Sequence, residues 1–430
     1  MVTRTLAAPG GTLHMKLEDV DLCDLDRFAR AEHHEMFSVL RAEDPVHWTP
    51  EPDGPGFWSI TKHADLVQVN RDHESFSAEK GGITLFEFDQ DPEADMRGKI
   101  MVMTDPPRHT RYRLLVNKGF TPRMIGLLES HLQYRAELIV DSVIERGECE
   151  FVTDLAAELP LQAIAEIMGV PEEERHLLFD WTNSMIGADD PEYNKDETNR
   201  NTARGAAAEL YLYAAALGEA RRQDPREDIV TRLINAEIDG EKLSSEEFEM
   251  FILLLAVAGN ETTRNATAHG MHALMTNPDQ FALLCEQPEL LPTAIEEILR
   301  WASPVLYFRR QATCDYELNG KTIKAGDKVA MWFVSGNRDE EVFADPFRFD
   351  VTRTPNDHIA FGGGGAHFCL GANLARLELR LLFEQIITRV PDMRIAGDVE
   401  RLRSNFIGGI KHIPVEFTPG KRLHPEPVSV

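Results

Sequence analysis

The segment that most constrains this chain is FILLLAVAGNETTRNATAHGMHAL, residues 251–274. Its apolar residues predict a helix of the protein core, and the polar run 259–263 interrupts that helix. An acid and two alcohols in such a place carry a desolvation cost unless they are hydrogen-bonded or take part in chemistry. A glycine, and a threonine that bonds back to its own helix, would loosen the helix and leave room for a small ligand or water. Taken alone, the pattern fits a kinked core helix as well as a functional one.

The rest of the chain predicts a mainly α protein with small β-sheets. It has 430 residues, of which 43% are hydrophobic and 27% charged, values typical of a globular protein with an ample core. Apolar residues at three- and four-residue spacing dominate from residue 121 onward. Residues 45–62 and 315–335 instead read as strands, the second stretch around an Asn-Gly turn. We find no internal repeat or linker and expect a single domain over residues 1–430.

Charge and apolar patterning argue against several classes of protein. The formal net charge is −27 without a basic tail, so no nucleic-acid partner is expected. The opening MVTRTLAAPGG lacks the apolar core of a secretory signal, and the apolar run 251–258 is too short to cross a bilayer. We therefore expect a cytoplasmic protein without a transmembrane anchor. Five scattered cysteines with no CxxC pair argue against a disulfide framework or a structural zinc site.

One cysteine, Cys369, has an unusual neighbourhood. It lies in AFGGGGAHFCLGANLAR, residues 360–376, behind four glycines and ahead of a predicted helix. The glycines let a bulky flat partner approach the backbone closely, but neither GxGxxG nor GxxxxGK[ST] fits the stretch. His367 and Cys369 are too few ligands for zinc. From these residues alone, a buried structural thiol and a nucleophile whose base is brought near by the fold both remain open.

Two further groups of charged residues stand at helical spacing. Glu297 and Arg300 can pair on one helix face, and Arg348 from the later loop NRDEEVFADPFRFD could join them in a buried network. A solvated surface pair is the alternative. His109 and Arg113 lie one helical turn apart, a spacing suited to gripping a carboxylate or to facing solvent.

Together these motifs resemble the cytochrome P450 family over essentially the whole chain. The family has an acid–threonine kink in a long apolar helix, an ExxR helix, an aromatic–arginine loop and a glycine-rich loop ending in HxCxG. AGNETT, EILR, DPFRF and GAHFCLG follow here in that order. One departure is Phe361, which stands eight residues before the cysteine, one more than is usual. The longer loop resembles a bacterial branch of methyl-branched-lipid terminal hydroxylases and sterol side-chain hydroxylases. AGNETTRN, WASPVLYFRR and the cysteine loop look most like the branched-lipid hydroxylases.

The resemblance implies the P450 fold, with a heme b between the kinked helix and the cysteine loop. Cys369 would be the thiolate ligand of the heme iron, sheltered by the glycines and by backbone N–H groups. Phe361, Gly365 and Gly371 would lie against the heme. The two heme propionates need cationic or hydrogen-bonding partners inside a protein. By residue matching these partners would be His109, Arg113, Arg310 and His367.

The resemblance also assigns the chemistry. Glu261 and Thr262 stand where the family relays protons to bound dioxygen, with the hydroxyl holding ordered water and the acid passing protons from solvent. Glu297, Arg300 and Arg348 become a structural network that supports folding and heme retention. The implied reaction is hydroxylation of a hydrophobic substrate, in first place at the end of a methyl-branched fatty acid or isoprenoid lipid. A steroid or terpenoid hydroxylase of the same fold is the alternative.

Substrate and partner residues follow from the same matching. The expected pocket wall consists of apolar residues that could equally be plain core, namely Ile83, Leu85, Met101, Met103, Leu255, Ala258, Val305, Phe308 and Ile407. No flavin or iron–sulfur motif appears along the chain, so electrons must come from separate proteins. In the resemblance these are a ferredoxin and its NAD(P)H-dependent reductase. The ferredoxin would dock on a basic face, whose alternative is scattered solvated charge, made of Arg108, Arg111, Lys118, Arg376 and Arg380.

Two rival functions use the same cysteine ligand. A heme-thiolate peroxygenase or isomerase works without reductive oxygen activation, and activity with hydrogen peroxide but not with redox partners would favour it. The intact Glu261–Thr262 pair speaks against it. A non-catalytic heme sensor would tolerate loss of the threonine and would couple to a signalling segment, and this sequence shows neither feature.

Overall fold

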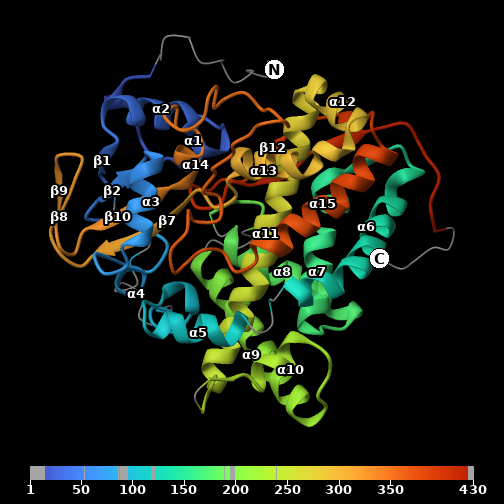
Figure 1. Cartoon of the computed structure of the whole chain (residues 1–430), viewed down its shortest axis with the longest axis horizontal. Coiled ribbons are helices and arrows are strands. Elements are labelled where there is room, and N and C mark those ends of the chain that lie inside the picture. Colours follow the sequence, from blue (N-terminus) through green and yellow to red (C-terminus); the bar gives the residue numbers. More distant parts are fainter. Residues whose placement is uncertain are drawn as a thin grey trace.

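The computed structural model describes residues 15–424, except 53, 86, 88–94, 118–119, 121, 188, 194–198 and 239. Helices dominate it (Figure 1). They are α1 (Leu25–Ala29), α2 (His33–Glu43), α3 (His63–Arg71), α4 (Ala78–Gly81), α5 (Arg108–Asn117), α6 (Pro122–Ile144), α7 (Glu158–Met168), α8 (Arg175–Ile186), α9 (Asn199–Gln223), α10 (Ile229–Ile234), α11 (Ser245–Thr276), α12 (Pro278–Glu286), α13 (Leu291–Ala302), α14 (Phe333–Gly336) and α15 (Ala372–Arg389). Shorter helical turns are η1 (Leu17–Asp19), η4 (Met101–Met103), η5 (Val152–Ala156), η6 (Glu172–Glu174) and η7 (Pro288–Leu290).

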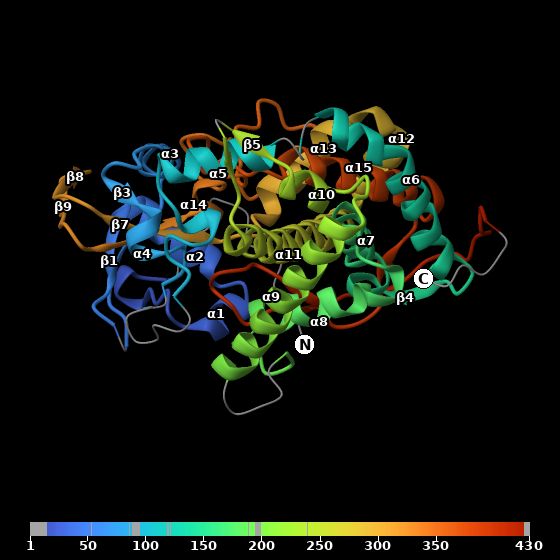
Figure 2. The same cartoon turned by 90° about the horizontal axis from the view of Figure 1, so that it is seen from below.

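Helix α11 is the axis of the fold. It begins with a capping box, in which the Ser244 hydroxyl accepts the Glu247 N–H at 3.1 Å and the Glu247 carboxylate accepts the Ser244 N–H at 2.9 Å. Most of its apolar side chains are buried, as expected for a helix packed on several sides. Figure 2 shows it running along the middle, with α8 and α9 on one side and α13 and α15 on the other.

The expected interruption does not break α11. The helix is continuous over Ser245–Thr276, and the Thr262 hydroxyl donates to the carbonyl of Ala258 at 2.6 Å, the back-bond that the sequence suggested. Gly259 has a packing role, because a Cβ there would lie 2.9 Å from Cγ1 of Ile164 on α7. The glycine therefore lets α7 lie directly against α11.

The strands are short and gather mainly at one end of the molecule, on the left in Figure 1. They are β1 (Val46–Thr49), β2 (Phe57–Ile60), β3 (Phe76–Ser77), β4 (Glu148–Glu150), β5 (Glu237–Ile238), β6 (Glu241–Lys242), β7 (Tyr307–Ala312), β8 (Tyr316–Leu318), β9 (Lys321–Ile323), β10 (Lys328–Trp332), β11 (Arg394–Ile395), β12 (Glu400–Arg401), β13 (Ile410–His412) and β14 (Pro414–Glu416). The largest sheet has the order β1-β2-β10-β7-β3, with β10 parallel to β2 and antiparallel to β7. The predicted Asn-Gly turn joins β8 and β9, and Asn319 and Gly320 there have φ of 48° and 73°.

Two apolar cores flank α11. One lies among α6, α11, α13 and α15, and the other among α7, α9, α10 and the first half of α11. A Cβ at Gly270 of α11 would lie 2.7 Å from Ile298 on α13 and 3.0 Å from Phe383 on α15. Glycine therefore lets three helices meet there, which fixes α15 and the cysteine loop before it against α11. Among the helices described, none combines the length and the apolar character that a membrane span requires.

Candidate active site

The cysteine loop, residues 360–371, is held in shape by contacts from outside it. Residues 362–365 have φ of 93°, 63°, 100° and 81°, which glycine adopts at little cost. Asn70 of α3 donates through Nδ2 to the carbonyls of Gly362 and Gly364, the second at 2.9 Å. Its Oδ1 accepts from Nη2 of Arg310 at 3.3 Å. One buried amide thus ties the glycine run to β7.

Cys369 stands at the N-terminal end of α15. Its N–H donates to the carbonyl of Phe361 at 3.1 Å and closes the loop. Burial raises the pKa of the Cys369 thiol, whereas hydrogen bonds from the N–H groups of Gly371 and Ala372 and the charge of Arg113 lower it. Donors and positive charge at a helix N-terminus stabilise a thiolate, which is the form that binds a metal ion.

From accessible surface on Cys369 and on the middle of α11 we infer a hollow between them. Cys369 has accessible surface. It nevertheless lies deep in the fold, because burial raises the pKa of its thiol. Ala258 is exposed and Thr262 partly exposed in the middle of the otherwise buried α11, and a Cβ at Gly371 would meet open space. Because α15 packs against α11, accessible surface on elements this deep indicates a space inside the protein.

Four basic side chains from three segments of the chain meet near the cysteine. His109 and Arg113 come from α5, Arg310 from β7 and His367 from the cysteine loop. The rings of His109 and His367 lie 4.2 Å apart. Burial lowers the pKa of His109 to about 4 and that of His367 to about 2, and the two arginines add to both effects. Burial also lowers the pKa of Arg310 to about 10.

This cluster of basic residues needs a negative partner. Nε2 of His367 is buried and has no hydrogen-bond partner. Asp105 acts on the cluster electrostatically, but it already accepts hydrogen bonds from the Ser77 hydroxyl and from the Ala78 N–H at 2.9 Å. Burying positive charge without a counter-charge is costly. The carboxylates of two heme propionates would supply what is missing, so the residues present fit the predicted cofactor.

On α11, Glu261 is buried and holds one free oxygen. Burial raises the pKa of its carboxyl. Arg264, three residues on, binds its Oε2 and donates to Oδ1 of Asn183 on α8 at 2.8 Å. Oε1 has no partner, and Glu261 lines a cavity of about 10 Å³ together with Tyr193 and Lys411, about the space that one water needs. An acid with a raised pKa and a water-sized space beside it can take up and release a proton.

The predicted pocket residues divide into accessible and buried ones. Those with accessible surface are Ile83, Leu85, Ala258, Val305 and Phe308. Those that are buried are Met101, Met103, Leu255 and Ile407. Val305 and Ile407 pair as an isolated antiparallel bridge. The segment after α13 and the segment before β13 therefore lie side by side.

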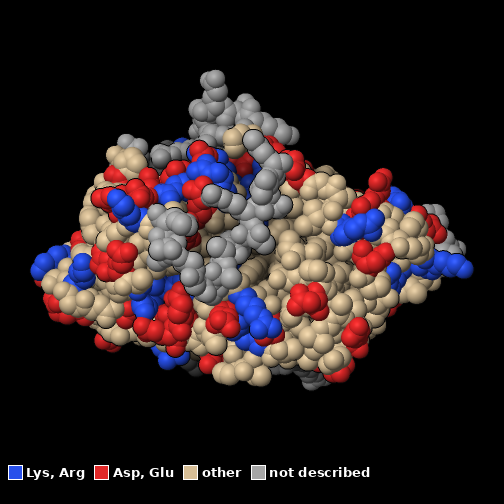
Figure 3. Space-filling view, turned by 90° about the horizontal axis from the view of Figure 1, so that it is seen from above, with Lys and Arg blue, Asp and Glu red and all other residues tan. Residues whose placement is uncertain are grey.

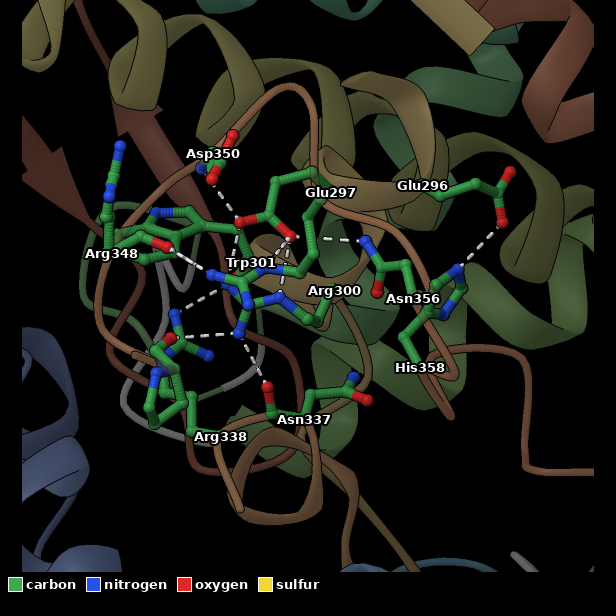
Figure 4. A network of polar contacts seen from close by, with 12 residues as sticks. Glu296, Glu297, Arg300, Trp301, Asn337, Arg338, Arg348, Asp350, Asn356 and His358 are labelled. Carbon is green, nitrogen blue, oxygen red and sulfur yellow. Dashed lines mark hydrogen bonds and ion pairs between the residues drawn. The ribbon is translucent and has the colours of Figure 1, made fainter. Parts of the chain in front are cut away.

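The ExxR pair is the centre of a complete network of hydrogen bonds (Figure 4). Glu297 and Arg300 are fully buried and joined by two hydrogen bonds of 2.7 and 2.8 Å. Arg300 also donates to the carbonyls of Asn337 at 2.8 Å and Pro346 at 2.9 Å. Glu297 accepts the N–H of Asp350 at 3.0 Å. The network ties α13 to the loop that leads to the cysteine.

Arg348 enters this network only through its main chain, which corrects the predicted role of its side chain. Its side chain points away from Glu297 (Figure 4), and its carbonyl accepts from Arg300 at 3.4 Å and from Arg353 at 2.9 Å. The second arginine that pairs with Glu297, besides Arg300, is Arg353, at 3.0 Å. A turn, in which the Arg348 N–H donates to the carbonyl of Asp345 at 2.9 Å, directs the later arginine back toward α13.

The predicted docking arginines are largely paired within the protein. Each of Arg111, Arg376 and Arg380 has at least one glutamate partner. Arg108 instead donates to a tyrosine hydroxyl at 2.9 Å, and Lys118 lies outside the described residues. Acidic and basic side chains also lie interspersed over the face seen in Figure 3. The described surface thus mixes both signs of charge in these places, although the net charge is −27.

Known proteins match this arrangement over most of its length. The family model described as Cytochrome P450 matches residues 194–390. A steroid C26-monooxygenase of Mycolicibacterium smegmatis is 46% identical over 393 residues, which cover 89% of this chain and 90% of that protein. This chain belongs to the cytochrome P450 family. A second P450 relative, a methyl-branched lipid omega-hydroxylase of Mycobacterium tuberculosis, is 42% identical over 414 residues and covers 94% of this chain and 95% of its own.

Solved P450 structures share the fold. A Mycobacterium marinum cytochrome P450 in complex with pseudoionone has a TM-score of 0.86 at 37% identity and covers 96% of this chain and all of its own. A Bacillus megaterium P450 in complex with corticosterone has a TM-score of 0.80 at 32% identity, covering 91% and 99%. The predicted fold and the predicted membership of a heme monooxygenase family are confirmed.

Three residues that support the P450 site were absent from the sequence-based prediction. Asn70 and Arg353 contact it from segments with no recognisable motif. Arg264 follows Glu261 by three residues, and that helical spacing is a signal from which its ion pair could have been predicted.

Proposed function

We propose that this P450 hydroxylates the end of a methyl-branched alkyl chain carried by a sterol or a branched lipid. The observation that carries the proposal is the agreement of its relatives, since a steroid C26-monooxygenase and a methyl-branched lipid omega-hydroxylase both match about nine-tenths of the chain. Carbon 26 of a sterol is a methyl group at the end of a branched side chain, so both names describe oxidation of the same kind of group. The apolar accessible residues Ala258 and Phe308 suit such a chain.

The cofactor would be a heme held by Cys369. Such a heme would supply the chemistry that, with two electrons, two protons and dioxygen, puts one oxygen atom into a C–H bond and releases the other as water. The N–H groups of Gly371 and Ala372 would keep the sulfur in its thiolate form. Phe361 and Gly365 would lie beside the macrocycle. The propionates would be held by His109, Arg113, Arg310 and His367.

Glu261 and Thr262 would deliver the protons that this reaction consumes. The Thr262 hydroxyl donates to its own helix, so its oxygen keeps lone pairs to hold a water in the hollow. Glu261 would take a proton from the solvent side through the water-sized cavity and pass it on. Arg264 would fix the orientation of the carboxylate that does so.

Electrons would come from a ferredoxin, reduced in turn by an NAD(P)H-dependent reductase. Arg108 is exposed and bonds a neutral hydroxyl, so an acidic ferredoxin can pair with it at little cost. Arg111, Arg376 and Arg380 would exchange their glutamate partners for carboxylates of the ferredoxin, and a steep decline of reduction rate with salt is the expected sign of this.

Product mapping with matched substrates tests the proposed function. The enzyme, with ferredoxin and reductase, is given a sterol that has a full branched side chain and the same sterol nucleus without it. Phytanic acid and unbranched palmitic acid form a second pair. We expect oxygen on a terminal methyl group of the branched chains and no product from the truncated sterol. Ring oxidation at equal rates in both sterols would contradict the proposal.

A further inference from the structure

A second cavity, which shares no residue with the cysteine loop, lies beside the later half of α11. Its walls come from α2, α11, α13, the segment after α14, and the chain from β12 to β13. Figure 1 shows α2, α13 and β12 gathered around that part of α11. The cavity has a volume of about 80 Å³, several times what one water needs.

All titratable side chains that line this cavity are basic. Among the described residues that line the cavity there is no carboxylate. Helix α13 contributes Trp301 and Ala302, which do not titrate. The titratable residues of the wall are six basic side chains from four elements: His33 and His34 of α2, His269 and His272 of α11, Arg338 just after α14, and Arg401 of β12. We refer to these six residues as the basic cavity.

Two of the six are deeply buried and have nitrogen atoms without a partner. His33 is 8% exposed and Arg338 2% exposed. Nδ1 of His33 and both Nε and Nη1 of Arg338 have no hydrogen-bond partner. Arg338 is otherwise anchored, since its Nη2 donates to the carbonyl of Trp301 at 2.8 Å and its guanidinium lies 4.9 Å from the centre of that ring. The carbonyl of Gly408 accepts from Nε2 of His269 at 3.2 Å, but the three nitrogen atoms of His33 and Arg338 lack an acceptor.

The pKa shifts of these residues also indicate that a negative charge is missing from the cavity. Burial lowers the pKa of His33 to about 3 and that of His272 to about 4, and the charge of Arg401 lowers both further. Burial lowers the pKa of Arg401 as well. Glu297 acts on Arg338 from a distance, but its carboxylate is committed to the ExxR network. The positive charges around the cavity are thus uncompensated.

Four imidazoles in one cavity suggest a metal ion, but their geometry argues against it. Among the described residues, the set of three possible ligands whose atoms lie within 4.8 Å of one another is Glu192, Glu400 and His412. None of the four cavity histidines belongs to that set, and zinc needs at least three converging ligands. Arg338 and Arg401 would also repel a cation.

We propose that the basic cavity binds a small oxyanion, with inorganic phosphate as the ligand class. Its oxygens would accept from Nδ1 of His33 and from Nη1 of Arg338 and would neutralise Arg401, which are the missing contacts. A bound anion would tie α2 and β12 to the part of α11 that follows Glu261 and Thr262. The inference does not depend on which substrate the P450 oxidises.

Calorimetric titration of the purified holoenzyme tests this site. In a buffer free of phosphate and sulfate, sodium phosphate is titrated into the wild type and into the Arg401→Gln and His272→Gln variants. The matched control is Arg394→Gln, which removes an arginine from an exposed surface pair with Glu416. We expect saturable one-to-one binding to the wild type and to the control. Affinity should fall at least tenfold in Arg401→Gln and several-fold in His272→Gln. The Soret spectrum of each variant verifies that it folds with heme.

A second readout is the proton that accompanies the anion. Binding of sulfate, which unlike phosphate does not itself titrate near neutral pH, should take up protons below about pH 6, because an anion raises the pKa of His33, His34, His269 and His272 from the low values that burial and the two arginines impose. Titration in two buffers of different ionisation enthalpy measures that uptake. The cavity volume admits phosphate or sulfate but not a nucleotide, so AMP should not compete.

The outcomes separate the alternatives. Heat that matches an equal ionic strength of sodium chloride, or equal phosphate affinity in Arg401→Gln and wild type, would overturn the proposal. Competition by AMP would also overturn it, by moving the site to the open surface. Phosphate binding without activity on any sterol would leave this inference standing while the proposed function failed.

Discussion

Two buried clusters of charge in this P450 differ in whether they are complete. In the ExxR network, Glu297 is surrounded by Arg300 and Arg353, and the arginines find carbonyl groups for their remaining donors. Around His109 and His367, Arg113 and Arg310 outnumber Asp105, whose carboxylate is already hydrogen-bonded, and a buried ring nitrogen has no partner. A cluster that satisfies itself holds the fold together, whereas one that does not is built to receive a partner.

The largest expected effect comes from breaking the complete cluster. Glu297→Gln leaves two buried arginines without a counter-charge, which costs about 3–5 kcal/mol. Urea unfolding should show that loss, and little heme-loaded protein should be recovered. Glu289→Gln, on an exposed residue of η7, is the matched control and should unfold within about 0.5 kcal/mol of the wild type. Equal stability of Glu297→Gln and the wild type would refute the structural role of the network.

Removing a charge from the incomplete cluster around His109 and His367 should weaken heme binding and leave the protein folded. Arg310→Gln removes a hydrogen bond to a charged group, worth about 1.5–3 kcal/mol. Heme transfer to apomyoglobin should therefore speed up roughly tenfold to a hundredfold. The urea midpoint of the heme-free variant should fall by much less than that of Glu297→Gln, because the loss of the hydrogen bonds from Arg310 to Asn70 and to the Arg309 carbonyl is offset by the removal of a buried positive charge. A heme-free variant as unstable as Glu297→Gln would erase the distinction between the clusters.

The incomplete cluster should also make the stability of the heme-free protein depend on pH. The pKa of His109 lies at about 4 in the native protein, below the value of about 6.5 in an unfolded chain. The unfolded state therefore binds protons first, and the heme-free protein loses stability as the pH falls below about 6.5. His109→Gln should reduce that loss by about 2 kcal/mol between about pH 7 and pH 5. The exposed His176→Gln is the control, and identical slopes for both variants would contradict the assignment.

Two threonines on α11 each donate their hydroxyl to the carbonyl four residues earlier, so together they test the proposed proton relay. Thr262 is partly exposed, whereas Thr267 is buried and bonded to the carbonyl of Thr263 at 2.9 Å. Thr262→Ala should lower the product formed per NADH several-fold, with peroxide released instead. Thr267→Ala should keep the wild-type yield. Unchanged yield in Thr262→Ala would show that the relay assignment is wrong.

The smallest effect tests which arginine completes the network. Arg348→Gln keeps the carbonyl that the network uses and should change the free energy of unfolding by no more than about 0.5 kcal/mol. Arg353→Gln removes a buried partner of Glu297 and should cost about 2 kcal/mol or more. Urea unfolding of the two variants side by side decides the matter, and the reverse order would restore the arginine that the sequence suggested.

Local patterns in the sequence predicted their structures because the interacting residues are neighbours along the chain. Glu297 and Arg300 share one helix face, and Asn319 and Gly320 specify their own turn. Cys369 could be proposed as the heme ligand because its motif lies within one loop, and that role stays a prediction. Contacts between distant segments left no such signal. Asn70 meets the cysteine loop from 292 residues away, and Arg353 depends on how a loop turns.

The basic cavity illustrates the same limit more strongly. His33, His269, Arg338 and Arg401 lie in four separate segments, and each taken alone resembles an ordinary surface or core residue. Their meeting in one space depends on the packing of α2 against the rest of the fold, which periodicity and motifs do not specify.

The most direct test of the central claim is an optical titration of the ferric holoenzyme, observed in the Soret band. The ligands are the sterol with its branched side chain and the same nucleus without it. The account predicts a saturable low-spin to high-spin shift with the branched sterol and no shift with the truncated one. Equal shifts with both sterols, or a shift with the truncated sterol alone, would contradict a site built for the end of a methyl-branched chain.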